Sequence, residues 1–400
     1  QVGTSRLELG GLNTYTGGTV LQPGFKQLGA TGRLGTGGID FDGTTFVQLA
    51  GGVIPSQAAT VRGSTSVTLA GANTLTTLTF DNNGGTSPTL IPTGTLTLTT
   101  PNFYTGATAA SGASAVIKAA FLSDTSSSLG ASSLTDPTNL VLASGATLEF
   151  IGTTSTTTSR SFTVDGSAGI ATGSGASPLI FTTASKIALV GANPELKLVA
   201  NNSGTNIFRA ALSEADLLAG NGIQNLAIDG TGTWVIGGNS NRFKGDIRID
   251  AGAGSTIGLE SSALPNGGGA VIALANNARV RYETGNTDDL SGKLSLAAGT
   301  TGKLDLGNNN VAFNSALAVA AGTGSTATLT KEGAGKLTIA AGNNTNLNLS
   351  VTAGTLVVNS TLGNVSLAAE TTLGGSGTVG AVTTVSGSTI SPGNSPGNLT

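Results

Sequence analysis

Asp40 and Asp42 are the first residues whose type and spacing could do chemistry. The run IDFD places them at positions i and i+2, and in a β-strand this spacing puts both carboxylates on one face. Enzymes that cleave polysaccharides use paired carboxylates as acid and base. Catalysis here would need further carboxylates or a basic partner on neighbouring strands, and only Lys26 and Arg33 lie near in the sequence. We interpret the pair as a solvated strand face.

Glu283, Asp288 and Asp289 form a second acidic cluster. Carboxylate oxygens are the ligands that hard cations such as Ca²⁺ prefer. The chain lacks the GGxGxDx nonapeptides with which β-rolls bind calcium. A surface loop is therefore the favoured interpretation, and we predict no metal ligand here.

Two short motifs look like known binding sequences. Gly375, Gly377 and Gly380 spell G-x-G-x-x-G, but a dinucleotide site needs a following helix and an acidic residue about 20 positions on. Neither is present in the sequence that follows, so we expect a turn. Lys244-Gly245-Asp246 is similar to a tripeptide that integrins bind, but it lies inside a repeat and is interpreted as a structural turn.

Four aromatic residues could be platforms on which a carbohydrate stacks: Trp234, Tyr15, Phe243 and Tyr282. Tyr15 and Phe243 occupy the same position of a repeated unit. That shared position indicates a structural aromatic side chain that covers the core at a turn. We therefore predict no catalytic residue, no cofactor site and no metal site in the chain.

The composition excludes most other chemistry. Among 400 residues there is no His and no Cys, so Ser-His-Asp triads, Cys-His pairs and thiolate zinc sites are absent. A net charge of −3 gives no electrostatic surface for nucleic acid.

We find no run of 18 apolar residues that would span a membrane. The start lacks a signal-peptide pattern and an initiator Met, which we interpret as an excised or mature piece.

The elements that must position any site are short strands. Runs such as 74–80 (TLTTLTF), 93–99 (TGTLTLT) and 355–358 (TLVV) alternate apolar residues with Thr or Ser. This period of two places Leu, Val and Ile on one face, as in a half-buried strand. The 62 glycines and many asparagines between the runs supply turns. The sequence therefore predicts an all-β protein.

Internal repeats decide how the strands are arranged. The unit apolar-x-apolar-Gly-Gly-x-Asn-x-aromatic-x-Gly occurs at 7–17 and again, with one extra residue, at 234–245. Irregular spacing between copies is tolerated in a solenoid whose loops vary in length. Stacked rungs also explain the scarcity of charge, because identical charges repel while Asn and Thr ladders form hydrogen bonds. A β-sandwich would need several domains and visible linkers.

We therefore predict a parallel β-helix in one continuous array over residues 1–400. Two stretches depart from the strand pattern: 114–122 (SAVIKAAFL) and 206–218 (NIFRAALSEADLL). Their apolar spacing predicts one or two short helical excursions, near 110–125 and 204–220. We interpret them as loops on the flank of the helix, with a module that contacts a partner as the alternative.

Several segments resemble the autotransporter-associated β-strand repeat: 13–19 (NTYTGGT), 157–164 (TTSRSFTV), 329–339 (LTKEGAGKLTI) and the tail 373–400. The most specific element is 391–397 (SPGNSPG). The resemblance implies a right-handed parallel β-helix that is exported across the outer membrane and displayed on the bacterial surface. A chain without Cys suits such export, because no stray disulfide can form in an oxidising periplasm.

Two classes of function remain open at this point. The first is a non-catalytic passenger stalk or adhesin, extracellular or at the bacterial cell surface, which contacts a host, cell or abiotic surface. The alternative is a subunit that assembles with other copies of itself into an extracellular filament or surface layer, because an uncapped terminal rung is an unpaired sheet edge. A polysaccharide-cleaving β-helix enzyme is the remote alternative. We predict no nucleic-acid partner and no transmembrane segment.

Overall fold

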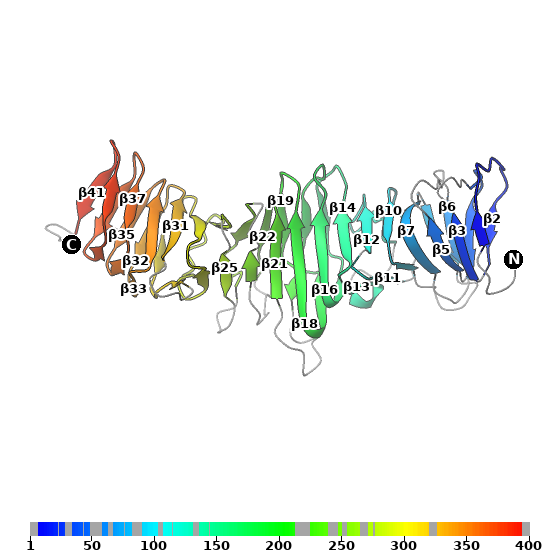
Figure 1. The fold of residues 1–400 in the computed structure, drawn as a ribbon, viewed down its shortest axis with the longest axis horizontal. Helices are drawn as coiled ribbons and strands as arrows, with labels where there is room; N and C mark the ends of the chain where they lie inside the picture. The colour runs from blue at the N-terminus through cyan, green and yellow to red at the C-terminus, as the bar shows by residue number, and fades with distance from the viewer. Residues whose placement is uncertain are drawn as a thin grey trace. The chain divides into compact units, whose positions relative to one another are not determined.

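Alternation of apolar and small polar residues produces strands along the whole described chain, and every strand pair is parallel (Figure 1). These features belong to a computed structural model. It describes residues 7–393 except 23, 29–33, 43, 49–57, 63–66, 76, 82–89, 103–106, 114, 131–135, 144, 213–224, 239–246, 250–253, 265–270, 275–276 and 320–325. The all-β parallel β-helix is confirmed.

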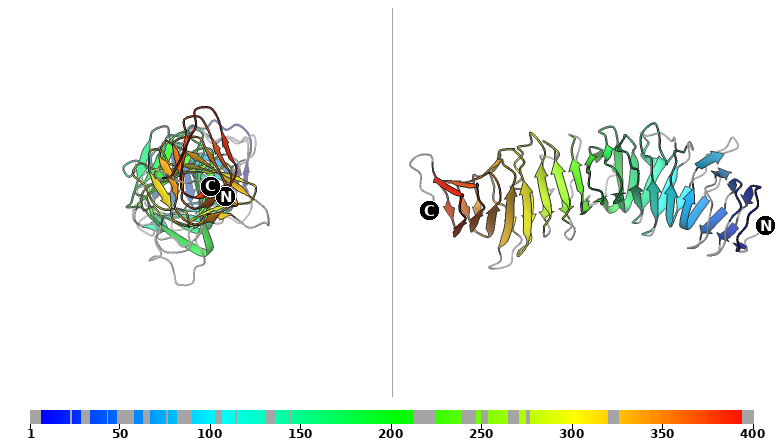
Figure 2. Two further views of the ribbon diagram at one scale, coloured as in Figure 1. Left: turned by 90° about the vertical axis from the view of Figure 1, so that its left-hand side faces the viewer. Right: turned by 90° about the horizontal axis from the view of Figure 1, so that it is seen from above.

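The chain forms two compact units. Unit 1 comprises Gln1–Gly204 and Arg209–Gly222, and unit 2 comprises Thr205–Phe208 and Ile223–Thr400. The expectation of one continuous array over residues 1–400 stays a prediction. Within each unit successive strands stack in chain order, as the view from above in Figure 2 shows.

Unit 1 has one long set of parallel strands and two smaller ones. The long set contains β1 (Leu7–Leu9), β3 (Gly24–Leu28), β5 (Thr44–Gln48), β7 (Val67–Leu75), β9 (Leu90–Pro92), β10 (Thr95–Leu98), β11 (Thr108–Ser111), β12 (Val116–Ala119), β13 (Leu140–Ala143), β14 (Thr147–Phe150), β16 (Phe162–Thr172), β18 (Lys186–Ala200) and β20 (Ala211–Leu212). The smaller sets are β2 (Thr19–Leu21), β4 (Ile39–Asp42), β6 (Ala58–Arg62) and β8 (Thr77–Asp81), and β15 (Thr156–Thr158) with β17 (Leu179–Phe181).

Unit 2 has four sets of parallel strands. The first is β19 (Thr205–Phe208), β22 (Thr233–Ile236), β24 (Thr256–Leu259), β26 (Arg279–Tyr282), β28 (Thr301–Asp305), β31 (Ala327–Glu332), β34 (Leu347–Val351), β37 (Val365–Leu367) and β40 (Val382–Thr384). The second is β21 (Asn225–Gly230), β23 (Ile247–Ile249), β25 (Ile272–Leu274), β27 (Leu294–Leu296) and β30 (Ala318–Val319). The third is β29 (Val311–Phe313), β32 (Lys336–Ile339), β35 (Thr355–Val358), β38 (Thr372–Gly375) and β41 (Thr389–Pro392), and the fourth is β33 (Asn343–Asn344), β36 (Thr361–Leu362) and β39 (Thr378–Val379).

In the C-terminal part of unit 2 each turn of the coil consists of three strands, one from each of three sheets. The rung β31, β32, β33 is followed by β34, β35, β36 and then by β37, β38, β39. Inward-facing residues stack in register, and Leu329, Leu349 and Val365 form one such column with at most 1% exposure. These columns form the hydrophobic core, which supplies most of the stabilisation of a solenoid.

Asparagine side chains join consecutive rungs outside the core. The Asn348 side-chain oxygen accepts a hydrogen bond from the Asn364 backbone N–H at 2.9 Å. The Asn364 side-chain oxygen in turn accepts from the Ala381 N–H at 2.9 Å. Neutral side chains thus satisfy backbone N–H groups at the turns. This agrees with the low charge content of the sequence.

The expectation of a helix at 114–122 is wrong. Val116–Ala119 is strand β12, and Ile117 and Ala119 face the core with 0% exposure. Alternation in this run outweighs its alanine content, because burial against neighbouring rungs overrides local propensity. Residues 123–126 form bends between Leu122 and Ser127, and these two residues form an isolated antiparallel bridge.

The helix expected at 206–218 is also wrong where the chain is described. Thr205–Phe208 and Ala211–Leu212 are strands β19 and β20, and 213–218 lies outside the described residues. Helical structure in the described chain is limited to one 3₁₀ turn, Pro137–Asn139. Among those residues no helix is long and apolar enough to cross a membrane.

Candidate functional site

Asp40 and Asp42 share the outer face of β4, as their spacing predicts. Ile39 and Phe41 are buried, whereas the two aspartates are half-buried. The register places Asp40 beside Val20 of β2 and Thr60 of β6. Neither neighbour is acidic, so the register brings no further carboxylate beside Asp40.

Of the two basic residues suggested for this pair, Lys26 lies among the described residues. Lys26 is 2% exposed and lies on β3, which belongs to a different sheet from β4. Arg33 lies outside the described residues.

Each carboxylate of the second acidic cluster has its own protein donors. Glu283 accepts hydrogen bonds from Arg281 at 2.8 and 2.6 Å. Asp288 accepts from the Ser262 backbone N–H at 2.7 Å. In the part of the chain that the structure describes, no three carboxylates gather where they could hold an ion.

Asp289 lies in the same loop as Asp288 and joins two rungs through its hydrogen bonds. One carboxylate oxygen accepts from the Ser291 N–H at 2.9 Å and hydroxyl at 2.6 Å. The other accepts from the backbone and side-chain N–H groups of Asn314, each at 3.0 Å. Desolvation raises the Asp289 pKa, but these four hydrogen bonds together outweigh it and hold that pKa below its ordinary value.

We expect Asp289→Asn to destabilise the protein at neutral pH by about 1 kcal/mol, since the exposed carboxylate is well screened. A carboxylate with a lowered folded-state pKa contributes stability above its unfolded pKa and loses it as the pH falls through the folded pKa. The variant should therefore lose less stability than the parent on acidification below pH ~4. Urea unfolding followed by circular dichroism at pH 7 and pH 3 measures this difference. An equal acid loss in both proteins would contradict it.

Two of the candidate aromatic platforms are buried and cannot meet a carbohydrate. Trp234 has 0% exposure and packs edge-on against Phe208, with ring centroids 6.5 Å apart. Tyr282 is 2% exposed, and its hydroxyl donates to the Asp288 carbonyl at 3.1 Å. Burial, with the nearby Asp289 and Asp288 charges, raises the Tyr282 pKa far above its ordinary value. Both rings belong to the core.

Tyr15 is the exposed member of this set among the described residues, at 41%. Its hydroxyl lies 2.6 Å from the Thr19 hydroxyl. A Cβ at Gly35 would overlap the Tyr15 ring, so one face of the ring packs against that glycine. The expectation of a structural aromatic side chain that covers the core at a turn stays a prediction. Phe243 and the 244–246 tripeptide lie outside the described residues.

The G-x-G-x-x-G glycines lie at a turn between strands. Gly375 ends β38, and strand β39 rather than a helix follows it. Gly375 has a φ of 115°, and a Cβ there would overlap the Val358 carbonyl of the preceding rung. A Cβ at Gly377 would overlap the Ser360 carbonyl. The glycines therefore serve close stacking of rungs, not phosphate binding.

We expect Gly375→Ala to destabilise unit 2 by about 2 kcal/mol or more, because alanine meets both an unfavourable φ and a backbone clash. Gly292→Ala is the matched control, since a Cβ at that position has no neighbour within 4 Å. Thermal unfolding monitored by circular dichroism compares the two. Equal midpoints for the two variants would show that the close stacking tolerates a methyl group.

A charged face on β26, β28 and β31 was not foreseen. Arg279 forms a two-contact ion pair with Glu332, at 2.9 and 3.3 Å, although β28 lies between their strands. A Cβ at Gly258 would overlap the Glu283 carboxylate, so this glycine leaves room for the neighbouring Arg281–Glu283 pair. Arg279 and Glu332 are 53 residues apart, and only the register of the strands reveals that they meet. Their chemistry is structural, since each cation meets a carboxylate of the same face.

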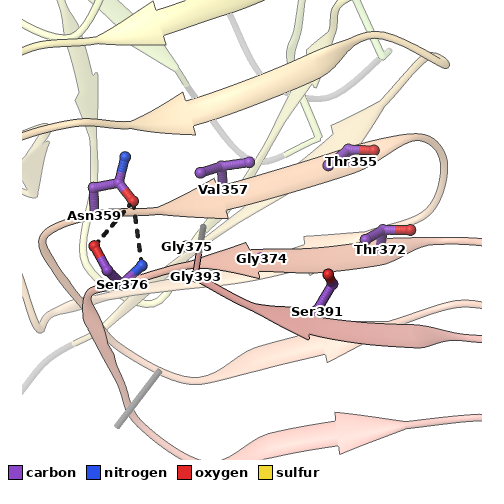
Figure 3. A pocket seen from close by; sticks show the side chains of 9 residues that line it. All are labelled: Thr355, Val357, Asn359, Thr372, Gly374, Gly375, Ser376, Ser391 and Gly393. Carbon is purple, nitrogen blue, oxygen red and sulfur yellow. Dashed lines mark hydrogen bonds between the residues drawn. The ribbon is translucent and has the colours of Figure 1, made fainter. Parts of the chain in front are cut away.

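A shallow polar hollow of about 240 Å³ lies on β35, β38 and β41 (Figure 3). Its walls carry the hydroxyls of Thr355, Thr372 and Ser391, and Gly374 leaves a gap in the outer row of side chains. At one end Asn359 accepts hydrogen bonds from Ser376. The lining has no charged residue and no aromatic ring, so it offers weak hydrogen bonding and no group for acid or base catalysis.

Comparison with known proteins gives one informative similarity. The chain is 30% identical over 358 residues to the adhesin BmaC autotransporter of Brucella suis biovar 1 (strain 1330). The match covers 79% of this chain and 10% of that protein's length. No family profile matches the chain, and no solved structure matches it. A distant autotransporter adhesin is thus similar to most of this parallel β-helical chain.

Proposed function

We propose that this chain is a non-catalytic passenger segment of a bacterial surface protein, in which it acts as an autotransporter-type stalk or adhesin. The observation that carries the proposal is the similarity of 79% of the chain to an autotransporter adhesin. The stacked parallel rungs support it, because such an array extends in one direction by repetition. The charged pairs and turn carboxylates support it too, since protein donors already occupy them.

Surface display is tested on intact cells of the bacterium that encodes the chain. Antibodies raised against the 400-residue chain should label intact cells, and added protease should remove the label without lysis. Cells in which the gene is deleted are the control. Label that appears only after permeabilisation would overturn the proposal.

Adhesion is tested with beads that carry the purified chain. Coated beads should attach to host cells or to an abiotic surface more strongly than beads coated with the heat-unfolded chain. Soluble folded chain should compete for attachment. Display without attachment would favour a stalk over an adhesin, whereas attachment that soluble chain fails to block would exclude specific adhesion.

A further inference from the structure

Aspartate stands directly before glycine at three places in the chain: 42–43, 165–166 and 229–230. Gly43 lies outside the described residues, so the structure describes the second and third pairs in full. In such a pair the glycine nitrogen can attack the aspartate carboxyl group, because glycine has no side chain to shield its nitrogen. The attack needs the two groups to lie together, and this geometry distinguishes the two pairs.

Asp229 turns its carboxyl group toward the nitrogen of its own glycine. The Gly230 N–H donates to Asp229 Oδ1 at 2.7 Å. Because only three atoms separate this nitrogen from the carboxyl carbon along the covalent chain, the short contact also holds the carboxyl carbon close to the nitrogen. Reacting atoms in a near-attack arrangement lie about 3–3.5 Å apart. The pair is therefore already arranged toward a five-membered ring.

The fold holds Gly230 in this position. Gly230 ends β21 with a φ of 89°, a conformation that glycine adopts without strain. Its carbonyl accepts a hydrogen bond from the Ser255 hydroxyl at 2.9 Å. Ser255 is fully buried directly before β24. The attacking nitrogen thus belongs to a residue that is fixed on its other side by the next rung.

Asp165 has the same following residue but a different geometry. It lies in β16, where the register with β18 shifts. One of its carboxylate oxygens lies 3.2 Å from the place that a Cβ on Gly191 would occupy, so this carboxyl group faces β18. Gly166 also has a positive φ, of 74°. Exposure alone would favour reaction at this pair, because Asp165 is exposed whereas Asp229 is half-buried.

We propose that Asp229–Gly230 is a site of self-modification, at which aspartate converts to isoaspartate through a cyclic imide. First, the Gly230 nitrogen bonds to the carboxyl carbon of protonated Asp229, and the carboxyl hydroxyl leaves with the amide proton as water. Then a water molecule adds to the main-chain carbonyl carbon of Asp229 and breaks its bond to the nitrogen, so that the chain runs through the former side chain. The water released in the first step balances the water consumed in the second.

The product changes the backbone of unit 2. Isoaspartate adds one methylene group to the main chain at the end of β21 (Figure 1). Ile228, directly before it, is fully buried and lies in register with Ile249 of β23. The turn at 231–232 must therefore absorb the added length before β22 begins. Since no enzyme drives the reaction, the modification accumulates with time after folding, and it is independent of the proposed function.

Peptide mapping of the folded 400-residue chain tests this proposal. The chain is incubated for several weeks at mildly acidic pH and digested, and its isoaspartyl peptides are quantified by chromatography with electron-transfer fragmentation. Isoaspartate at position 229 should form at least about fivefold faster than at position 165, because only the Asp229 contact is near attack geometry. An equal or slower rate at position 229, the less exposed site, would overturn the proposal.

The same chain incubated in urea is the matched control. Unfolding removes the geometry but leaves both Asp–Gly sequences, so the two positions should then form isoaspartate at similar rates. A preference for position 229 as large in urea as in the folded chain would assign it to the local sequence and overturn the proposal. Hydroxylamine, which opens a cyclic imide, should leave a hydroxamate at position 229 of the folded chain. Isoaspartate there without any hydroxamate would contradict the imide route.

Discussion

Trp234→Ala should destabilise unit 2 by about 3–5 kcal/mol, the largest loss that we expect from a single side chain. The indole is fully buried in β22 and packs edge-on against Phe208 of β19. Its removal leaves a large cavity between rungs, and neighbouring strands cannot close it because their hydrogen bonds fix the rung spacing. Urea unfolding followed by circular dichroism measures the loss without relying on tryptophan fluorescence.

Trp234→Phe is the matched control. The indole N–H has no hydrogen-bond partner among the described residues, so phenylalanine removes volume but no polar contact. We expect it to lose less than half as much stability as alanine. Equal losses for the two variants would mean that the indole ring itself, rather than the filled volume, stabilises this part of the core.

Raising the pH from 8 to 10.5 should increase the stability of unit 2 through Lys331. Burial lowers the pKa of this lysine from 10.5 to about 8. The folded chain therefore releases the proton first, and between these pH values the unfolded chain binds more protons. Stability rises with pH wherever the unfolded state binds more protons. Across the whole window from pH 8 to 10.5, the free energy of unfolding should rise by about 3 kcal/mol.

Urea midpoints measured from pH 7 to 10.5 test this dependence. The parent protein and Lys336→Met should both gain stability across the window, whereas Lys331→Met should show no gain from this group. A curve of the same slope for all three proteins would assign the effect to other groups. A fall in stability for the parent alone would mean that its contacts favour the charged amine over the neutral one.

Period-two alternation was enough to predict the strands, and the internal repeats predicted their parallel stacking, in which inward residues such as Leu329 and Leu349 lie in register on successive rungs. The same rule applied to residues 114–122, where alanine-rich composition suggested a helix. Ile117 and Ala119 are buried at alternate positions of β12, so burial against the next rung decided the structure. The helix propensity of these residues carries no information about that burial.

Side-chain chemistry was harder to predict, because it depends on register. The distance between Asp40 and Asp42 follows from their spacing, whereas the pairing of Arg279 with Glu332 needs two rungs of known length. Loops of variable length hide that register in the sequence. Lys331 was missed for a similar reason, since alternation marks its position as inward but gives no sign of the carbonyls that receive it.

The parallel register has a consequence for how such a chain grows. Leu349 pairs with Val365 and Leu356 with Leu373, so each of these strands finds its partner one rung further along the chain. Contacts in a stack of this kind stay local however many rungs it has, and the entropy of closing each loop stays nearly constant. Folding then resembles the growth of a one-dimensional crystal, in which the first rungs form the nucleus and each later rung adds to a finished template. Length alone therefore need not slow the addition of the last rung.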